Sequence, residues 1–255
     1  MIELIDVVRK YGDKTAVENL NLSIPQGELF AFLGPNGAGK TTTIKMLVGL
    51  LHPTSGQVRV GGVDVVQSPR DANRLSGYVP DEPYLYDKLT GREFLHFVAE
   101  AYGLSPCDAS EAIQRQIETF GLASFVDQLG ESYSHGMKQR LVFASALLHR
   151  PRVLIVDEPM VGLDPRSMRL VKDLLRQLAQ EGVTIFMSTH TLFIAEQIAD
   201  RIGVINHGRL LFLGTVEELR QRLELHDHSL EDLYLALMED ERPSSREFET
   251  GDSAA

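Results

Sequence analysis

The residues Gly34-Pro35-Asn36-Gly37-Ala38-Gly39-Lys40-Thr41 match the pattern GxxxxGK(S/T) in full. Glycines allow such a loop to turn several backbone N–H groups toward phosphate oxygens without side-chain obstruction. A helical pattern begins at Lys40, so the positive end of a helix dipole also faces the loop. Lys40 can reach the β- and γ-phosphates of a nucleotide, and the Thr41 hydroxyl can bind Mg²⁺. A glycine-rich turn in an unrelated fold is disfavoured, because the apolar run Leu29–Leu33 leads directly into the loop.

A second stretch with related chemistry is the apolar run Val153–Val156, which is followed by Asp157 and Glu158. A continuous apolar run suits a strand that is buried on both faces of a parallel sheet. An acid at the end of such a strand, beside a phosphate loop, holds Mg²⁺ directly or through water. Glu158 could polarise an attacking water as a general base. Without the phosphate loop, a solvated strand end would be the better interpretation of this pair.

The remaining chain alternates strand and helix patterns, which predicts an α/β sheet with crossover helices. Strands are expected at Val183–Thr189, Arg201–Asn206 and Leu210–Leu213, and helices after Asp164, over Thr191–Asp200 and from Thr215 through Leu223. Thr215 and Glu218 fit a capping box for the last of these helices. From about 81 to 150 apolar residues recur at helical spacing, which predicts a mostly helical insertion. The first 30 residues show only short strand-like pieces, with a turn at Tyr11–Gly12.

The composition is that of a globular chain with an acidic balance. The 255 residues include 36 acidic and 25 basic ones, a formal charge of −11, which argues against broad binding to nucleic acids. The single cysteine, Cys107, excludes an intrachain disulfide and allows a reducing compartment. The N-terminus does not resemble a signal peptide, and no apolar run reaches the about 18 residues of a membrane span. Residues 239–255 carry six acids against two bases and are expected to form a disordered tail.

A third motif, Tyr133-Ser134-His135-Gly136-Met137, is followed by Lys138-Gln139-Arg140. By itself it could be an ordinary helix capped by Ser134. The motif lies shortly before the Val153–Val156 strand, in a chain that also carries the phosphate loop. In this context it resembles the LSGGQ signature of the ATP-binding subunits of ABC transporters, in a variant common among exporter subunits. The resemblance covers residues 1–238. It implies a P-loop NTPase of the α/β class: a RecA-like core with a parallel sheet, an N-terminal antiparallel β part and a helical insertion at about 82–150.

The resemblance also implies roles for individual residues. Lys40, Glu158 and His190 would be catalytic, with His190 contacting the γ-phosphate. Tyr11 would stack on adenine, although a simple turn tyrosine is the alternative. The residues expected to bind ATP are Tyr11, Gly34, Pro35, Asn36, Gly37, Ala38, Gly39, Lys40, Thr41, Thr42, Ser134, Gly136 and Asp164. The residues expected to hold Mg²⁺ are Thr41, Asp157 and Asp81.

Two positions depart from the family pattern. Asp81 stands where the family usually has a glutamine that touches Mg²⁺ and the lytic water. A carboxylate oxygen also suits Mg²⁺, so Asp81 is expected to keep a Mg²⁺-linked role. The Gly162-Leu163-Asp164 stretch resembles the D-loop, with Asp164 facing a partner subunit, but its usually small and polar first position is Val161.

The function implied by the resemblance is ATP hydrolysis that drives transport, and export rather than import, through a separate transmembrane permease. Two subunits, either two copies or a copy and a paralogue, would sandwich ATP head to tail, so that Ser134 and Gly136 bind a γ-phosphate held by the partner. The protein would lie on the cytoplasmic side of the membrane, or in the cytosol when free, with no nucleic-acid partner.

The permease is expected to contact an apolar and aromatic patch of Tyr84, Leu85, Tyr86 and Leu89, whose alternative role is internal packing. Two other functions stay open. One is a soluble ABC ATPase that is not coupled to a transporter. The other is a non-hydrolysing nucleotide-binding or scaffold subunit, and the presence of Lys40, Asp157, Glu158 and His190 argues against it.

Overall fold

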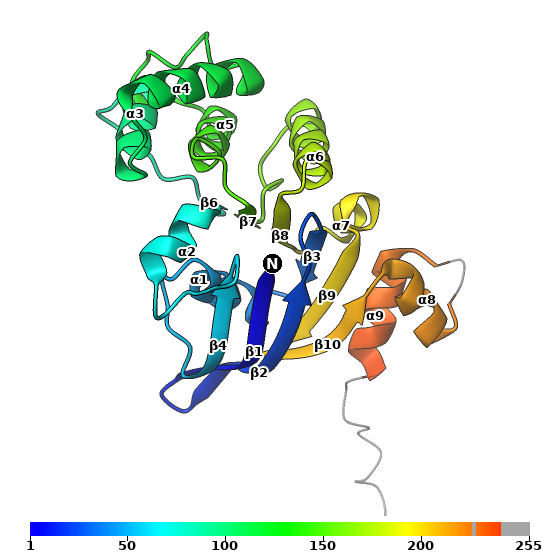
Figure 1. Ribbon diagram of the computed structural model, residues 1–255. Helices are drawn as coiled ribbons and strands as arrows, with labels where there is room; N and C mark the ends of the chain where they lie inside the picture. Colours follow the sequence, from blue (N-terminus) through cyan, green and yellow to red (C-terminus); the bar gives the residue numbers. More distant parts are fainter. Residues whose placement is uncertain (226–227, 241–255) are drawn as a thin grey trace, which may run out of the picture.

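The computed structural model describes residues 1–225 and 228–240, which form two β-sheets and surrounding helices (Figure 1). A four-stranded sheet has the order β2-β1-β4-β5 and a six-stranded sheet the order β10-β9-β3-β8-β7-β6. The first sheet contains β1 (Ile2–Tyr11), β2 (Lys14–Ile24), β4 (Ser55–Val60) and β5 (Val63–Asp64). The second contains β3 (Leu29–Leu33), β6 (Ser76–Val79), β7 (Val153–Asp157), β8 (Thr184–Thr189), β9 (Arg201–Asn206) and β10 (Arg209–Gly214). The first sheet is antiparallel, whereas β6, β7, β8, β3 and β9 run parallel, which confirms the expected α/β fold.

The central strands β3, β7 and β8 are buried along their whole length, because each has an apolar core on both faces. Side chains of a strand alternate between its faces. Leu29, Ala31 and Leu33 pack with most of the helices, whereas Phe30 and Phe32 pack with the antiparallel sheet and α1 (Lys40–Leu47). The parallel sheet is therefore the middle layer of the molecule.

The helices that cover the sheet begin where the sequence provides caps. The Asp164 carboxylate accepts hydrogen bonds from the backbone N–H groups of Arg166 and Ser167 at the start of α6 (Pro165–Gln180). Thr215 and Glu218 form the expected capping box of α8 (Val216–Leu223). Two further helices in the core fold are α2 (Pro69–Leu75) and α7 (Leu192–Ile198).

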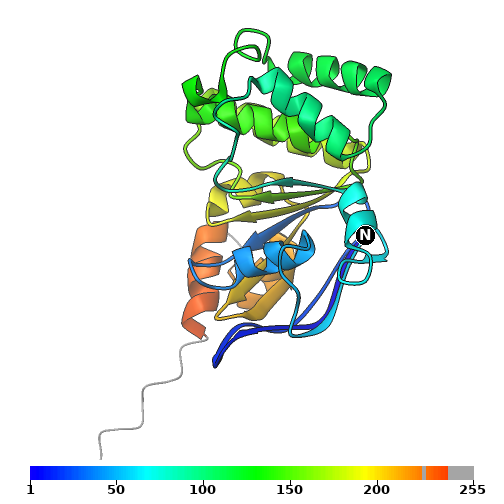
Figure 2. The same ribbon diagram turned by 90° about the vertical axis from the view of Figure 1, so that its left-hand side faces the viewer.

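The segment between β6 and β7 forms a separate helical group, as the periodicity predicts. It contains α3 (Gly91–Ala101), α4 (Pro106–Phe120), the short 3-10 helix η1 (Gly130–Ser132) and α5 (His135–Ala146). Figures 1 and 2 place this group, in green, on the side of the six-stranded sheet opposite to the antiparallel sheet. Its buried residues, such as Leu95, Ile113 and Leu141, belong to the same core cluster as the helix-facing side of that sheet.

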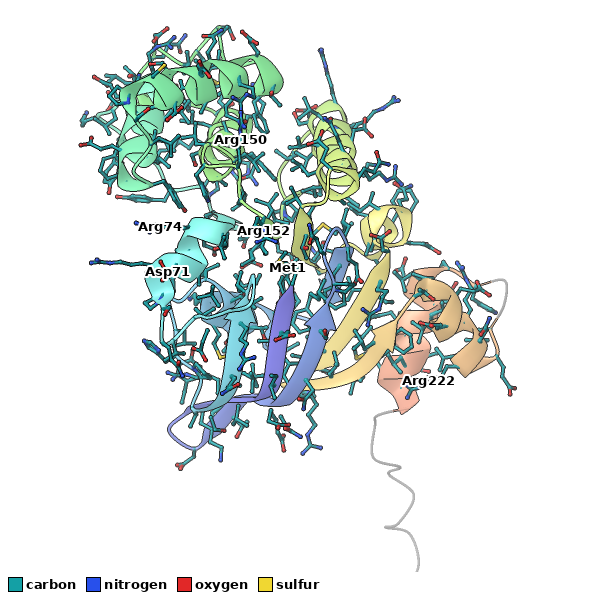
Figure 3. The ribbon with its side chains drawn as sticks, viewed as in Figure 1. Met1, Asp71, Arg74, Arg150, Arg152 and Arg222 are labelled. Carbon is teal, nitrogen blue, oxygen red and sulfur yellow. The ribbon has the colours of Figure 1, made fainter. Side chains whose placement is uncertain are left out.

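The chain returns from the helical group to the sheet through a short, well-bonded connection. The His149 ring stacks on Tyr102 with centroids 3.7 Å apart, and its Nε2 donates to the Ser76 carbonyl at 3.0 Å. The Arg152 backbone N–H donates to the Leu75 carbonyl at 2.8 Å. Figure 3 labels Arg152 and Arg150 at this connection. These contacts tie the helical group to the start of β6.

The N-terminal strands differ from the sequence expectation. Instead of short pieces, β1 and β2 are 10 and 11 residues long and pair around the expected turn. The pairing register shifts several times, and Asp6 and Asn19 have φ angles of 48° and 47°. Because each irregularity changes which face the next side chain occupies, the apolar alternation is interrupted and hides the length of the strands.

The C-terminal boundary also differs slightly from the expectation. Helix α9 (Leu230–Asp240) continues past residue 238 because Leu230, Leu233 and Leu237 are buried against the fold. Glu239 and Asp240 are therefore helical, and the other residues of the expected tail lie outside the described residues. No helix in residues 1–225 and 228–240 has the length and apolarity needed to cross a bilayer.

Candidate functional site

The loop between β3 and α1 is shaped by close backbone contacts at two of its glycines. A Cβ atom at Gly34 would lie 2.4 Å from the carbonyl oxygen of Ile205, and one at Gly39 would lie 2.7 Å from that of Ala16. Gly39 also has a φ angle of 116°, which side chains disfavour. Glycine is therefore required at both positions for the loop to fit between β2 and β9.

Lys40 is buried at the start of α1, with its amine directed back into the loop. Its Nζ donates to the Gly34 and Pro35 carbonyls at 2.6 and 3.3 Å and lies 3.9 Å from Glu158 Oε1. Burial lowers the pKa of this amine, although the carboxylates of Glu158 and Asp157 oppose the change. The ammonium group is thus held at the centre of the loop, where it can meet phosphate oxygens as a point charge.

Asp157, the last residue of β7, is the most buried carboxylate of the site, with 3% of its surface exposed. It lies opposite Ser188 in the β7–β8 register, and the Ser188 hydroxyl donates to its Oδ1. Burial raises the pKa of Asp157 and the carboxylates of Asp81 and Glu158 add to the rise, whereas the Ser188 hydrogen bond and Lys40 oppose it. The ionised form of such a buried carboxylate is unfavourable without a neighbouring positive charge. The side chain is therefore suited to bind a cation.

Glu158 follows directly, and both of its carboxylate oxygens are oriented by His190. Its Oε1 lies 3.0 Å from His190 Nδ1, and its Oε2 accepts the His190 backbone N–H at 3.2 Å. The backbone N–H of Glu158 donates to the Ser188 carbonyl at 3.0 Å. The φ angle of Glu158 is 47°, a left-handed conformation that costs a residue with a side chain about 1–2 kcal/mol. Such strain is concentrated at functional sites, where it fixes the direction of a reactive side chain.

These groups surround one cavity of about 710 Å³. Among the residues expected from the sequence, the cavity is lined by Tyr11, Pro35, Asn36, Gly37, Gly39, Lys40, Thr41, Thr42, Asp81, Asp157 and Glu158. Gly34 and Ala38 belong to the same loop but are buried beneath it. His190 does not line the cavity, but its ring contacts the Glu158 carboxylate, which does. The structure thus brings predicted residues as far apart in the sequence as Tyr11 and Glu158 to the wall of one cavity.

Four further lining residues, Lys14, Thr15, Ala16 and His207, have no counterpart in the sequence predictions. They belong to the start of β2 and to the β9–β10 turn. That turn is fixed beside the phosphate loop because the Gly208 N–H donates to the Ala38 carbonyl at 2.8 Å. No local motif marks these residues, since only the fold brings their backbone to the loop.

Asp81 lines the cavity together with Asp157 and Glu158. Burial raises the pKa of Asp81, and the nearby Glu158 and Glu82 carboxylates raise it further. Within the two described ranges, no three His, Cys, Asp or Glu side chains are grouped so that they could hold a metal ion by themselves. Asp157, Asp81 and the Thr41 hydroxyl in the cavity fit Mg²⁺, which usually takes one or two protein carboxylates together with substrate phosphates and water.

Besides Gly34, Ala38 and His190, three predicted residues do not line the cavity: Ser134, Gly136 and Asp164. Ser134 caps the start of α5, where a Cβ atom at Gly136 would meet no other atom within 4 Å. Asp164 caps α6, and hydrogen bonds from Ser167 lower its pKa. The two helix starts are linked, since His135 Nε2 lies 3.3 Å from the Val161 carbonyl oxygen. Within one chain these helix starts do not line the phosphate-loop cavity, although His135 and Val161 line a neighbouring hollow with Asp81.

Comparison with known proteins agrees with this geometry. The family model described as ABC transporter matches residues 17–161. The daunorubicin/doxorubicin resistance ATP-binding protein of Streptomyces peucetius is 41% identical over 233 residues, which cover 89% of this chain and 71% of that protein. The linearmycin resistance ATP-binding protein of Bacillus subtilis (strain 168) is 38% identical over 223 residues, 88% of this chain and 72% of that protein.

A solved structure of an ATP-binding subunit of an ABC transporter has a TM-score of 0.88 and 32% sequence identity, and covers 93% of this chain and 99% of its own. The phosphate loop, the buried carboxylates and these likenesses all agree. The chain belongs to the ABC transporter family and is similar to its ATP-binding subunits.

Proposed function

We propose that the protein hydrolyses ATP in a Mg²⁺-dependent reaction and thereby drives export through a separate transmembrane permease. The observation that carries this proposal is the position of Glu158, oriented by His190 and 3.9 Å from the amine of Lys40. A carboxylate held beside a phosphate-binding cation is suited to act on the water that attacks the γ-phosphate. A subunit that only bound nucleotide would not need this arrangement.

Each residue of the site has a separate role in hydrolysis. Lys40 and the backbone N–H groups of the loop bind the phosphates, and they stabilise the charge that shifts toward the leaving ADP. Glu158 takes a proton from the attacking water. At the same time the water oxygen bonds to the γ-phosphorus, and the bond between the γ-phosphorus and the leaving ADP oxygen breaks. His190 holds the glutamate in the required direction. Thr41 and Asp157 would hold Mg²⁺, which would supply positive charge next to the phosphates.

Ser134, Gly136 and Asp164 support a dimer in which two subunits complete each other's sites. The residues lie at two exposed helix starts and outside the cavity of their own chain. A helix start with a serine hydroxyl and an unobstructed glycine N–H is a suitable surface for phosphate. In a head-to-tail dimer, this surface would bind the γ-phosphate of ATP held by the partner's loop, and Asp164 would face the partner.

Asp81 provides a test of the metal-linked part of the proposal. We expect Asp81→Ala to raise the Mg²⁺ concentration for half-maximal hydrolysis about tenfold, because a carboxylate next to the phosphates is lost. Asp81→Gln, which restores the family's usual residue, should retain most of the hydrolysis rate. Asp71→Ala is the control, since it removes an exposed aspartate from α2 that does not line the cavity. Hydrolysis measured against Mg²⁺ concentration decides the matter, and an unchanged Mg²⁺ dependence in Asp81→Ala would remove Asp81 from this role.

The permease contact is proposed for an aromatic patch that differs from the sequence expectation. Tyr84 and Tyr86 are exposed, as is Phe97 of α3, whereas Leu85 is only 6% exposed and belongs to the core. The Tyr86 ring lies 5.9 Å from that of Tyr84 and 5.7 Å from that of Phe97, in edge-to-face contact. Exposed aromatic clusters of this kind are common at protein–protein interfaces. The patch Tyr84, Tyr86 and Phe97 is therefore the proposed contact.

Purification of the tagged protein from native membranes in mild detergent tests this coupling. We expect co-purification of a protein with several membrane spans, and at least a tenfold loss of it in the Tyr84→Ala/Tyr86→Ala double variant, because aromatic anchors carry a large share of interface energy. Phe193→Ala, which removes an exposed aromatic ring from α7, is the matched control. Recovery of ribosomes or DNA in place of a membrane protein would support a soluble ABC ATPase instead.

A further inference from the structure

We propose that Arg9 is a positioning residue for the adenine base of ATP. It acts through the ring of Tyr11, on which the base stacks. This inference rests on the proposed function and on the stacking of adenine on Tyr11. The guanidinium carbon of Arg9 lies 4.6 Å from the centroid of the Tyr11 ring. Tyr11 lines the phosphate-loop cavity and is 47% exposed, whereas Arg9 does not line it. The guanidinium group therefore contacts a ring that lines the cavity, without lining the cavity itself.

Arg9 is held in this place by the chain segment that follows α1. Its Nη1 donates to the His52 carbonyl at 2.9 Å. The same segment binds the neighbouring backbone, since Lys10 N–H donates to Thr54 Oγ1 at 3.0 Å and Thr54 N–H to the Val8 carbonyl at 2.7 Å. The end of β1 is thus fixed although the strand pairing shifts register between Arg9 and Lys10. A ring supported in this way does not need to be ordered when the base binds.

The charge of Arg9 is not neutralised by a carboxylate in the described parts of the chain, where its contacts are the His52 carbonyl and the Tyr11 ring. Its Nε is buried and has no hydrogen-bond partner. A buried donor without a partner is unfavourable, so the position needs a compensating interaction. The face of the Tyr11 ring provides it, because a weakly hydrated guanidinium is attracted to aromatic π-electrons.

A cation on one face of an aromatic ring draws π-electron density toward itself. The opposite face of Tyr11 consequently becomes poorer in electrons and stacks better on an electron-rich purine such as adenine. Arg9 and Tyr11 together therefore act as a selective platform for the base, while Lys40 and the loop bind the phosphates. The device raises affinity for the adenine part of ATP without a direct contact between Arg9 and the nucleotide.

A double-mutant cycle on the full chain tests this inference. We expect Arg9→Met to raise the Kd for ATP about fivefold, equivalent to about 1 kcal/mol, and to raise KM by a similar factor with kcat unchanged. In the Tyr11→Ala background, Arg9→Met should have no further effect. Inorganic triphosphate, which lacks a base, should bind equally well to the parent protein and to Arg9→Met. Arg9→Lys, which keeps the charge but loses the planar group, should give a smaller rise in Kd.

The control variant is Arg59→Met, which removes an arginine from β4 of the same sheet, outside the cavity. Equal thermal stability of the variants establishes that the changes concern binding. An unchanged Kd in Arg9→Met, an equal rise in the Tyr11→Ala background, or an equal loss of triphosphate binding would each overturn the inference. If Tyr11→Ala alone left ATP binding intact, the inference would fail while ATP hydrolysis stood. If the parent protein bound no ATP, the proposed function would fail.

Discussion

Replacing Glu158 by glutamine is expected to lower the rate of ATP hydrolysis at least about 100-fold, the usual contribution of a general base, while ATP still binds. Glutamine has nearly the same shape, and its oxygen can still accept the His190 N–H that Glu158 Oε2 accepts at 3.2 Å. It cannot accept a proton from water, so the bound nucleotide stays intact. Removing the carboxylate also removes repulsion between Glu158 and the phosphates, which favours the ATP-bound state.

The Glu158→Gln variant should therefore form a stable dimer in the presence of ATP. Phosphate release measures the loss of turnover, and size-exclusion chromatography with and without ATP measures association. Glu181→Gln, at the end of α6 and outside the cavity, provides the control for the chemical change. Phosphate release at the parent rate would exclude Glu158 as the base. Loss of hydrolysis without an ATP-dependent dimer would argue against the head-to-tail arrangement.

Replacing Lys40 by alanine is expected to act on binding as well as on turnover. The amine is the cation at the centre of the phosphate loop, 2.6 Å from the Gly34 carbonyl. A hydrogen bond to a charged group contributes about 1.5–3 kcal/mol, which corresponds to a loss of affinity of roughly 10- to 150-fold for ATP. Hydrolysis should fall further, because phosphate charge increases toward the leaving group in the transition state.

The matched control for this change is Lys45→Ala, which removes an exposed lysine from the same helix. Titration with ATP and measurement of phosphate release distinguish the two lysines. Lys40→Ala and Glu158→Gln should also differ from each other, because only the lysine change weakens binding. A Lys40→Ala protein that bound ATP with the parent affinity would show that the loop amides alone hold the phosphates.

Much of the site could be predicted because its central residues stand at the ends of buried strands. Apolar runs mark β3 and β7 without ambiguity, and the polar residues that follow them lie at the carboxyl ends of parallel strands, where α/β sheets bind their ligands. The contact of Ser188 with Asp157 was harder to predict, because only the β7–β8 register places the two residues opposite each other. The residues of β2 and of the β9–β10 turn could not be predicted, because their backbone joins the cavity through contacts between distant parts of the chain.

Other features could not be predicted for a different physical reason. The exposure of a side chain depends on how distant parts of the chain pack, and not on its neighbours in the sequence. Leu85 lies between two exposed tyrosines but is turned into the core of the helical group. Periodicity cannot separate the three, since the segment between β6 and α3 has no regular structure. The Arg9–Tyr11 contact is hidden similarly by the register shifts of β1. The motifs therefore predict which residues share the cavity better than they predict which side chains are exposed.

The position of β3 in the middle of its sheet has a consequence for the order of events during synthesis. Its pairing partners β8 and β9 lie at Thr184–Thr189 and Arg201–Asn206. A ribosome that adds about 5–20 residues per second needs roughly 8–30 s to produce the roughly 150 residues between β3 and β8. Throughout that interval β3 lacks both of its pairing partners, and the contact from Ile205 of β9 that shapes the phosphate loop has not been made. The nascent chain therefore acquires the ability to hold a nucleotide only late, after nearly four-fifths of it has been translated.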